Sequence, residues 1–177
     1  MRLRRQITPE GWHVPSDEEW KELEMYLGMS QSEADAAGWR GMGEGGKLKE
    51  TGTIHWNSPN TGATNESGFS AAAPGGYRHS TGYYYDMGSY AAFWSSTQGT
   101  SYYAWYRGLY YYGSGIYRGL DYKQYGFSVR CVIDSANDNN FHKQTTISIT
   151  GFRFVVSGIS LLFFYLYPDE IGIGNIY

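Results

Sequence analysis

Cysteine is almost absent from this chain of 177 residues, in which Cys131 stands alone. A single thiol can form neither an intrachain disulfide nor a thiolate zinc site, so the sequence gives no sign of an oxidising compartment. Basic residues are also outnumbered, with 14 Lys and Arg against 17 Asp and Glu and a net charge of −3. Because a general nucleic-acid binder needs a basic surface, this balance argues against nucleic acid as a partner.

A signal peptide and the usual catalytic motifs are missing as well. The basic start Met1–Gln6 has no apolar segment behind it, and a strong structural motif follows so soon that the N-terminus resembles a truncated one. The 4 histidines are scattered without the spacing of metal ligands. No G-x-S-x-G nucleophile motif is present. We therefore expect a protein without catalytic residues.

One glycine-rich stretch imitates a nucleotide-binding motif. Gly41, Gly43 and Gly46 spell G-x-G-x-x-G, and the stretch ending at Lys47 nearly spells a phosphate loop. However, Leu48 stands where a Ser or Thr must bind Mg²⁺, and the preceding segment is Ala-rich rather than a buried strand. A flexible Gly-rich loop is the better interpretation.

A long loop is predicted from Thr51 to Gly68, with Trp56 embedded in it. Its oxygen-bearing side chains include those of Asn57, Asn60, Asn65 and Glu66. Oxygen-rich loops can bind Ca²⁺, but a single carboxylate favours turn-forming Asx chemistry. We expect no cofactor, and Ca²⁺ binding is the alternative.

Two helices are predicted near the N-terminus, and short strands follow them. Ser16 opens the first helix with a capping box that Glu19 completes, and an apolar stripe leads to a stop at Gly28. Ser30 opens a shorter, Ala-rich helix that ends at Gly38. The predicted strands are Phe69–Ala73, Tyr83–Asp86, Ala91–Ser95, Tyr102–Leu109, Ile116–Arg118 and Phe127–Val132, the last with Cys131 as a buried, inert thiol. Helices followed by an antiparallel sheet indicate the α+β class.

The composition changes after Asp134. Residues 135–144 read as a polar linker, and Ile147–Tyr167 is strongly apolar, with Arg153 as its one charge. This length borders on that of a membrane span, although the arginine weakens that interpretation. Membrane association through 147–167, additional strands, a hydrophobic tail without fixed structure, and sequence foreign to the domain are the alternatives.

Tyrosine dominates the middle of the chain. Nine of the 24 residues from Tyr102 to Tyr125 are tyrosine, and Gly and Ser fill much of the rest. So many phenols make a poor core, because each buried hydroxyl needs a hydrogen-bond partner. The same mixture of Tyr, Gly and Ser suits a binding surface, as in antibody paratopes. A Tyr-rich meander that merely covers a small core is the alternative.

Several long motifs resemble one known family, the Fibrobacter succinogenes major paralogous domain. They are Gly11–Trp20 (GWHVPSDEEW), Gly62–Ser70 (GATNESGFS), Pro74–Arg78 (PGGYR), Trp94–Ser96 (WSS), Ala104–Arg107 (AWYR) and Gly126–Val132 (GFSVRCV). The resemblance covers residues 8–134 in order, and it leaves 135–177 as linker and tail. Thr8 stands where the family usually has a cysteine, so the resemblance implies that Cys131 lacks a partner.

The resemblance implies a C-type-lectin-like fold, with two N-terminal helices and an irregular antiparallel sheet with long loops. It implies a bacterial protein at the cell surface or secreted, without the oxidase activity of the related formylglycine-generating fold. Some relatives are diversified by retroelements between W-S-S and G-F-S-V-R-C. In an extended strand, scaffold residues Trp105, Arg107 and Leu109 would then share one face, and Tyr106, Gly108 and Tyr110 the other.

Together these observations predict a non-catalytic binding module for a protein or carbohydrate ligand. The tyrosines are expected to lie exposed on one surface. The ligand-binding residues predicted are Tyr106, Gly108, Tyr110, Tyr112, Tyr117, Asp121, Tyr122 and Tyr125. An enzyme of unknown reaction that uses the loop Asn57–Glu66 and a structural surface protein without a specific ligand are the alternatives.

Overall fold

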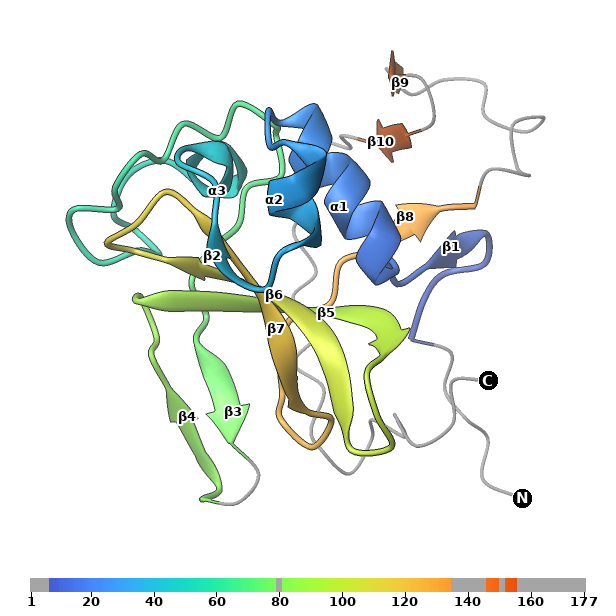
Figure 1. The fold of residues 1–177 in the computed structure, drawn as a ribbon. Coiled ribbons are helices and arrows are strands. Elements are labelled where there is room, and N and C mark those ends of the chain that lie inside the picture. Colours follow the sequence, from blue (N-terminus) through green and yellow to red (C-terminus); the bar gives the residue numbers. More distant parts are fainter. Residues whose placement is uncertain (1–6, 79–80, 135–145, 150–151, 156–177) are drawn as a thin grey trace.

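A four-stranded antiparallel sheet forms the centre of the molecule (Figure 1). Its strands are β5 (Tyr90–Gln98), β6 (Tyr103–Tyr110), β7 (Ile116–Tyr122) and β2 (Gly38–Arg40), in the spatial order β2-β7-β6-β5. The computed structural model describes residues 7–78, 81–134, 146–149 and 152–155. The class is thus mixed α and β with antiparallel sheets, as predicted.

Three short helices pack on one face of this sheet (Figure 1). Helix α1 (Asp17–Tyr26) begins at the predicted capping box, in which Ser16 and Glu19 satisfy each other's backbone amides. A second capping box opens α2 (Gln31–Asp35). This helix ends earlier than predicted, because Ala36 leaves helical geometry and the chain continues into β2.

The glycine-rich stretch differs from the prediction, since it contains helix α3 (Glu44–Leu48) rather than a flexible loop. A Cβ on Gly45 would strike the carbonyl of Gly115, and one on Gly46 would strike the carbonyl of Gly62. These glycines therefore let α3 approach the backbone of the long loop and of the β6–β7 turn.

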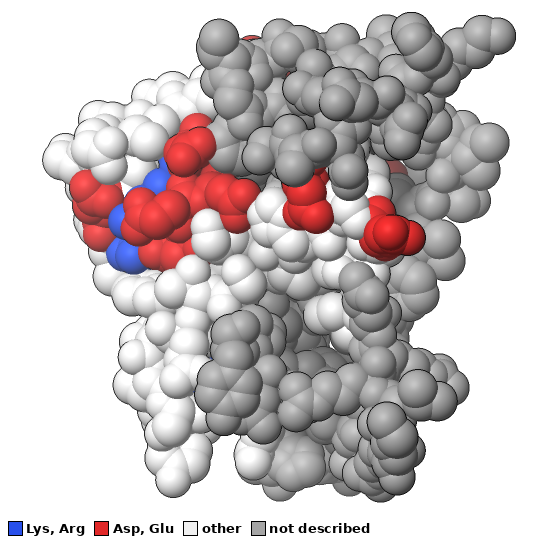
Figure 2. Space-filling view, turned by 90° about the vertical axis from the view of Figure 1, so that its right-hand side faces the viewer, with Lys and Arg blue, Asp and Glu red and all other residues white. Residues whose placement is uncertain are grey.

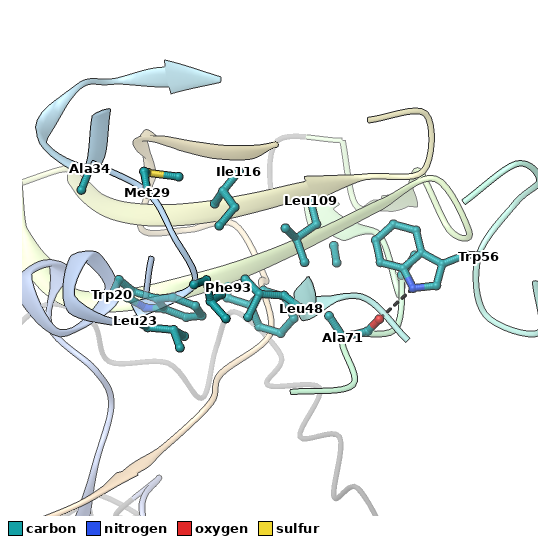
Figure 3. Close-up of a cluster of buried hydrophobic side chains, with 13 residues drawn as sticks. Trp20, Leu23, Met29, Ala34, Leu48, Trp56, Ala71, Phe93, Leu109 and Ile116 are labelled. Carbon is teal, nitrogen blue, oxygen red and sulfur yellow. Dashed lines mark hydrogen bonds between the residues drawn. The ribbon is translucent and has the colours of Figure 1, made fainter. Parts of the chain in front are cut away.

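The main hydrophobic core fills the space between the helices and the sheet. Trp20 and Leu23 of α1 meet Phe93 of β5, and Leu109 and Ile116 come from the neighbouring strands (Figure 3). The long loop joins this core through one side chain. Trp56 is buried there, and its indole Nε1 donates to the carbonyl of Ala71 at 2.7 Å. The loop predicted at 51–68 is confirmed, because no helix or strand lies within it.

A buried ionic network lies beneath α1. Arg107 of β6 donates to Asp17 at 2.7 Å and to Glu24 at 2.5 Å. Arg118 of β7 binds Asp17 at 2.6 Å, and Arg40 of β2 binds Glu24 at 2.9 Å. Burial alone would raise the pKa of Asp17, but hydrogen bonds from Arg118 and Arg107 outweigh it and hold the pKa below the usual value. The network joins the helix to three strands.

Two predicted strands are corrected by the structure. Residues 69–73 form only an isolated bridge, between Ala71 and Lys49. The stretch 127–132 is mostly irregular, with one bridge at Ser128 before the short strand β8 (Val132–Ile133). Each segment has a single bridge to another part of the chain rather than a series of paired residues. The pattern of apolar residues in a sequence does not show whether such pairing continues.

The remaining strands form small pairs. Strand β1 (Trp12–His13) pairs with β8, and β3 (Gly76–Arg78) pairs with β4 (Tyr83–Tyr85). Strand β9 (Thr146–Ile149) pairs with β10 (Phe152–Val155), so the start of the apolar tail is extended. The rest of 147–167 lies outside the described residues, as does the linker 135–144. Among the described residues, no helix has the length and apolarity to cross a membrane.

A histidine of the strand pair β1–β8 lies between two carboxylates and bridges them. His13 Nε2 lies 2.7 Å from Glu19, and Nδ1 lies 2.6 Å from Asp134. Burial lowers the pKa of His13, but the hydrogen bonds to Glu19 and Asp134 outweigh it and raise the pKa overall. A protonated imidazole can donate to both acids at once.

The ionic network predicts a strong effect of neutralising Glu24. Glu24→Gln should lower the free energy of unfolding by about 3 kcal/mol or more, because Arg40 and Arg107 would stay buried without sufficient negative charge. Urea denaturation measures this change. Glu22→Gln, exposed on the same helix, is the matched control and should change stability by less than about 0.5 kcal/mol. Equal stability of the two variants would contradict the role given to the network.

The bridge at His13 predicts stability that depends on pH. A raised folded-state pKa gives stabilisation that is complete below the unfolded value near 6.5 and is lost as pH rises through the higher folded value. His13→Gln should therefore be less stable than the parent protein at about pH 6 and nearly equal to it at about pH 9. Thermal unfolding across this range measures the difference. His55→Gln is the control, because it removes a histidine–carboxylate contact, to Glu50, that is exposed to solvent and should contribute little. A difference between His13→Gln and the parent that persists at high pH would argue against the bridge.

Candidate functional site

The two faces of the sheet are chemically different, as the alternation in β6 predicted. Arg107 and Leu109 point to the helices, into the ionic network and the main core. Tyr106 points to the opposite face, where it packs in a second cluster with Trp94 and Phe127. Side chains alternate along a strand, so Arg107 and Leu109 share one face of β6 and Tyr106 lies on the other.

The second cluster buries some of the tyrosines that were expected at the surface. Tyr106 is only 9% exposed, and it shares a hydrogen bond with Tyr90. Burial raises the pKa of Tyr106 to about 12, and burial also raises that of Tyr90. The hydrogen bond gives these buried phenols the partner that they require. The prediction that Tyr106 is exposed is therefore wrong.

Two glycines on this face lie beneath tyrosine rings. A Cβ on Gly108 would strike the hydroxyl of Tyr90, and one on Gly119 would meet the ring of Tyr117 at 2.5 Å. Gly108 is itself buried. Gly108 was predicted to contact a ligand directly, but the structure has the Tyr90 side chain packed against it.

At one end of the sheet the aromatic side chains reach solvent. Trp39 of β2 is 52% exposed, and its ring centroid lies 6.3 Å from that of Tyr110 and 5.4 Å from that of Tyr117. The β6–β7 turn continues the series, since the Tyr111 ring contacts those of Tyr110 and Tyr112. Tyr111 itself is half-buried, because it packs against the main core. Tyr112 is 64% exposed and Tyr110 is 39% exposed. We call these five residues, Trp39, Tyr110, Tyr111, Tyr112 and Tyr117, the Trp39 platform.

A smaller aromatic patch lies at the other end of the same strands. Tyr122 is 45% exposed, and its ring lies 4.6 Å from Tyr103 and 5.8 Å from Tyr125. Tyr125 is half-buried against Phe127. Asp121 is half-buried and accepts from the amide of Tyr122. From Tyr117 to Tyr122 an extended strand spans about 16 Å, so the two patches are separate.

The predicted site residues thus divide into three groups. Tyr110, Tyr112 and Tyr117 come together in the Trp39 platform, where Tyr117 is half-buried against the second cluster rather than exposed as predicted. Tyr122, Tyr125 and Asp121 lie at the opposite end, and Tyr106 and Gly108 lie between the two groups in the second cluster. The aromatic rings form a continuous series of contacts through this cluster, from Tyr117 to Tyr106, Phe127, Tyr125 and Tyr122.

The sequence reasoning missed Trp39. It belongs to a three-residue edge strand that was assigned to a helix end and a loop, yet it is the largest exposed ring of the platform. The sequence did contain a signal for this short strand, because glycines stand on either side of Trp39-Arg40 and glycine is typical of turns. Both adopt positive φ angles in the structure, 89° at Gly38 and 72° at Gly41. Met42, which is 92% exposed, lies beside the turn, since its carbonyl accepts from Ser114 at 2.8 Å.

The asparagines of the long loop have structural partners, as the turn interpretation predicted. Asn60 Nδ2 donates to the carbonyls of Glu50 and Gly52, and Asn65 binds Ser70 through both its side-chain atoms. Within the described residues, no group of three or more His, Cys, Asp or Glu side chains could hold a metal ion. Cys131 was expected to be buried but is half-buried, and burial raises the pKa of its thiol.

Acidic side chains gather on one side of the molecule (Figure 2). Turned by 90° from the first view, the molecule shows a band of Asp and Glu with few Lys or Arg (Figure 2). Helix α1 alone has three acids in its first turn. The platform contains none, and its contacts are aromatic.

The platform and the second cluster should respond differently to truncation. Tyr106→Ala should lower the free energy of unfolding by about 3 to 5 kcal/mol, because it removes a buried ring. Tyr112→Ala should change it by less than about 0.5 kcal/mol, because that ring is exposed. Chemical denaturation compares the two variants. A large loss in Tyr112→Ala would show that the platform serves stability rather than recognition.

Comparison with known proteins gives one match. No curated protein and no solved structure matches the chain. The model of one protein family, the Fibrobacter succinogenes major domain, matches residues 2–133. This range contains all three helices, the four-stranded sheet and the platform. The chain therefore belongs to the Fibrobacter succinogenes major domain family.

Proposed function

We propose that the protein is a non-catalytic binding module that holds a protein or glycan ligand on the Trp39 platform. The observation that supports this most directly is the exposure of Trp39 and Tyr112, which are not needed to fill the core. Trp and Tyr dominate the residues that contribute most to binding, because they offer a large rigid area at low entropic cost. Aromatic faces also stack on sugar rings.

A protein ligand has additional support from the surroundings of the platform. Met42 lies beside the β6–β7 turn and is exposed. Methionine is common on surfaces that adapt to several protein partners. The net charge of −3 and the acidic band in Figure 2 favour such a partner over nucleic acid.

We further propose that this domain is C-type-lectin-like, lies at the cell surface or is secreted, and binds without a cofactor. The arrangement of the β6–β7 segment also suits diversification by a retroelement. Arg107, Leu109 and Arg118 are engaged beneath the helices, whereas Tyr110 and Tyr112 can change with little effect on that core. A neighbouring reverse transcriptase gene with a near-repeat of codons 100–130 would support this, and its absence from the genome would oppose it.

The binding proposal predicts that the platform, and not aromatic exposure in general, determines ligand capture. On protein and glycan arrays, Trp39→Ala combined with Tyr112→Ala should weaken any specific signal by about tenfold or more. Tyr26→Ala is the matched control, because Tyr26 is equally accessible but lies on α1. Binding with added EDTA should be unchanged. A signal that survives the double substitution, or none on either array, would favour an enzyme or a structural protein instead.

A further inference from the structure

Lys49 is a fully buried lysine that has no carboxylate partner among the residues that the structure describes. Its exposed fraction is 0%, and it follows directly on α3 as that helix ends. Buried lysines normally pair with an acid, because an isolated charge is costly to remove from water. Lys21, which is also buried, follows this rule and binds Glu18 and Asp35 at 2.8 and 3.0 Å.

The ammonium of Lys49 instead binds backbone carbonyls. Its Nζ donates to Thr61 at 2.7 Å, to Gly113 at 2.9 Å and to Tyr110 at 3.2 Å. An ammonium has three N–H donors, so all of them are used. Nζ also lies 5.3 Å from the centroid of the Trp56 ring, within the range of a cation–π contact.

These carbonyls belong to segments that bear on the Trp39 platform. Tyr110 ends β6 and Gly113 follows Tyr112 in the β6–β7 turn, while Thr61 belongs to the long loop. Backbone hydrogen bonds also hold this turn: the Tyr111 amide donates to Ser89, and the Tyr111 carbonyl accepts from Thr61. The Gly113 amide donates to Tyr110 at 3.3 Å. Lys49 adds side-chain hydrogen bonds to the carbonyls of Tyr110 and Gly113. Lys49 therefore joins both ends of the exposed Tyr110–Tyr112 segment to the loop.

We propose that Lys49 is the positioning residue of the platform, and that its protonated ammonium fixes the β6–β7 turn in the conformation that presents Tyr110 and Tyr112. This inference rests on the proposed binding function. Lys49 is not placed to react as a nucleophile, since Nζ is fully buried and each donor has a partner.

The charge state of Lys49 then controls the turn. A neutral amine keeps two donors, so one of the three hydrogen bonds from Lys49 to backbone carbonyls would be lost and the turn would be held less firmly. The acidic side chains near these segments interact with groups other than Lys49. Glu50 binds His55, and Glu66 forms an ion pair with Lys47. Asp86 interacts electrostatically with the phenol of Tyr110. Burial lowers the pKa of Lys49 to about 8. We therefore expect the turn to loosen as pH rises through this value.

The first test follows the free protein, so it does not depend on a known ligand. The carbonyl ¹³C shifts of Thr61, Tyr110 and Gly113 should titrate with one shared inflection near pH 8. In Lys49→Met this inflection should vanish, whereas Lys21→Met should retain it. Absence of a shared inflection in the parent protein overturns the proposal, and this readout stands even where Lys49→Met does not fold.

The second test measures the turn directly at neutral pH. Amide hydrogen exchange at Tyr111 and Gly113 should be about tenfold or more faster in Lys49→Ala, because two carbonyl anchors are lost. Ethylammonium should restore slow exchange by occupying the vacated space as a donor, and tetramethylammonium, which has no N–H, should not. Equal rescue by both ions, or exchange unchanged from the parent, would show that Lys49 only fills space. A failed array experiment with successful rescue would refute the binding function and leave the positioning role intact.

Discussion

The contact between Asp17 and two arginines on neighbouring strands is the constraint on which the fold depends. Arg107 and Arg118 are direct partners in the β6–β7 register, so two positive charges face each other across the ladder. Like charges in this arrangement repel. The Asp17 carboxylate lies between them and accepts from both, and Glu24 extends the pairing to Arg40. The sheet is therefore complete only when α1 lies on it.

The two faces of β6 have different roles, so one strand can contribute both to packing and to the proposed recognition surface. In β6 the residues that face the helices are held by charge pairing and by the main core, so they are poor candidates for change. The opposite face carries rings that contact one another in series, with Tyr106 in the centre and exposed rings at the ends. Stability is concentrated at the centre of that face, and accessible aromatic area is concentrated at its ends.

Much of the framework could be predicted from local sequence, because its signals lie within a few residues of one another. The capping box at Ser16 and the alternation in β6 are of this kind, and both are confirmed. Features that depend on distant partners could not be found in this way. Tyr106 and Tyr112 have identical side chains, and Tyr106 is buried because residues distant in sequence, such as Trp94 and Phe127, pack on it. Likewise, the role of Lys49 depends on carbonyls up to 64 residues away.

The pairing of β1 with β8 places the entry and the exit of the domain side by side. The amide of Asp134 donates to the carbonyl of Gly11 at 2.8 Å, and Trp12 faces Ile133 across the pair. A domain with adjacent ends can be inserted into a host loop or repeated along a longer chain with short connections. Tension applied through those connections would first separate the two strands, one bond at a time, before it reached α1. The Trp39 platform would then keep its conformation while the connections are under tension.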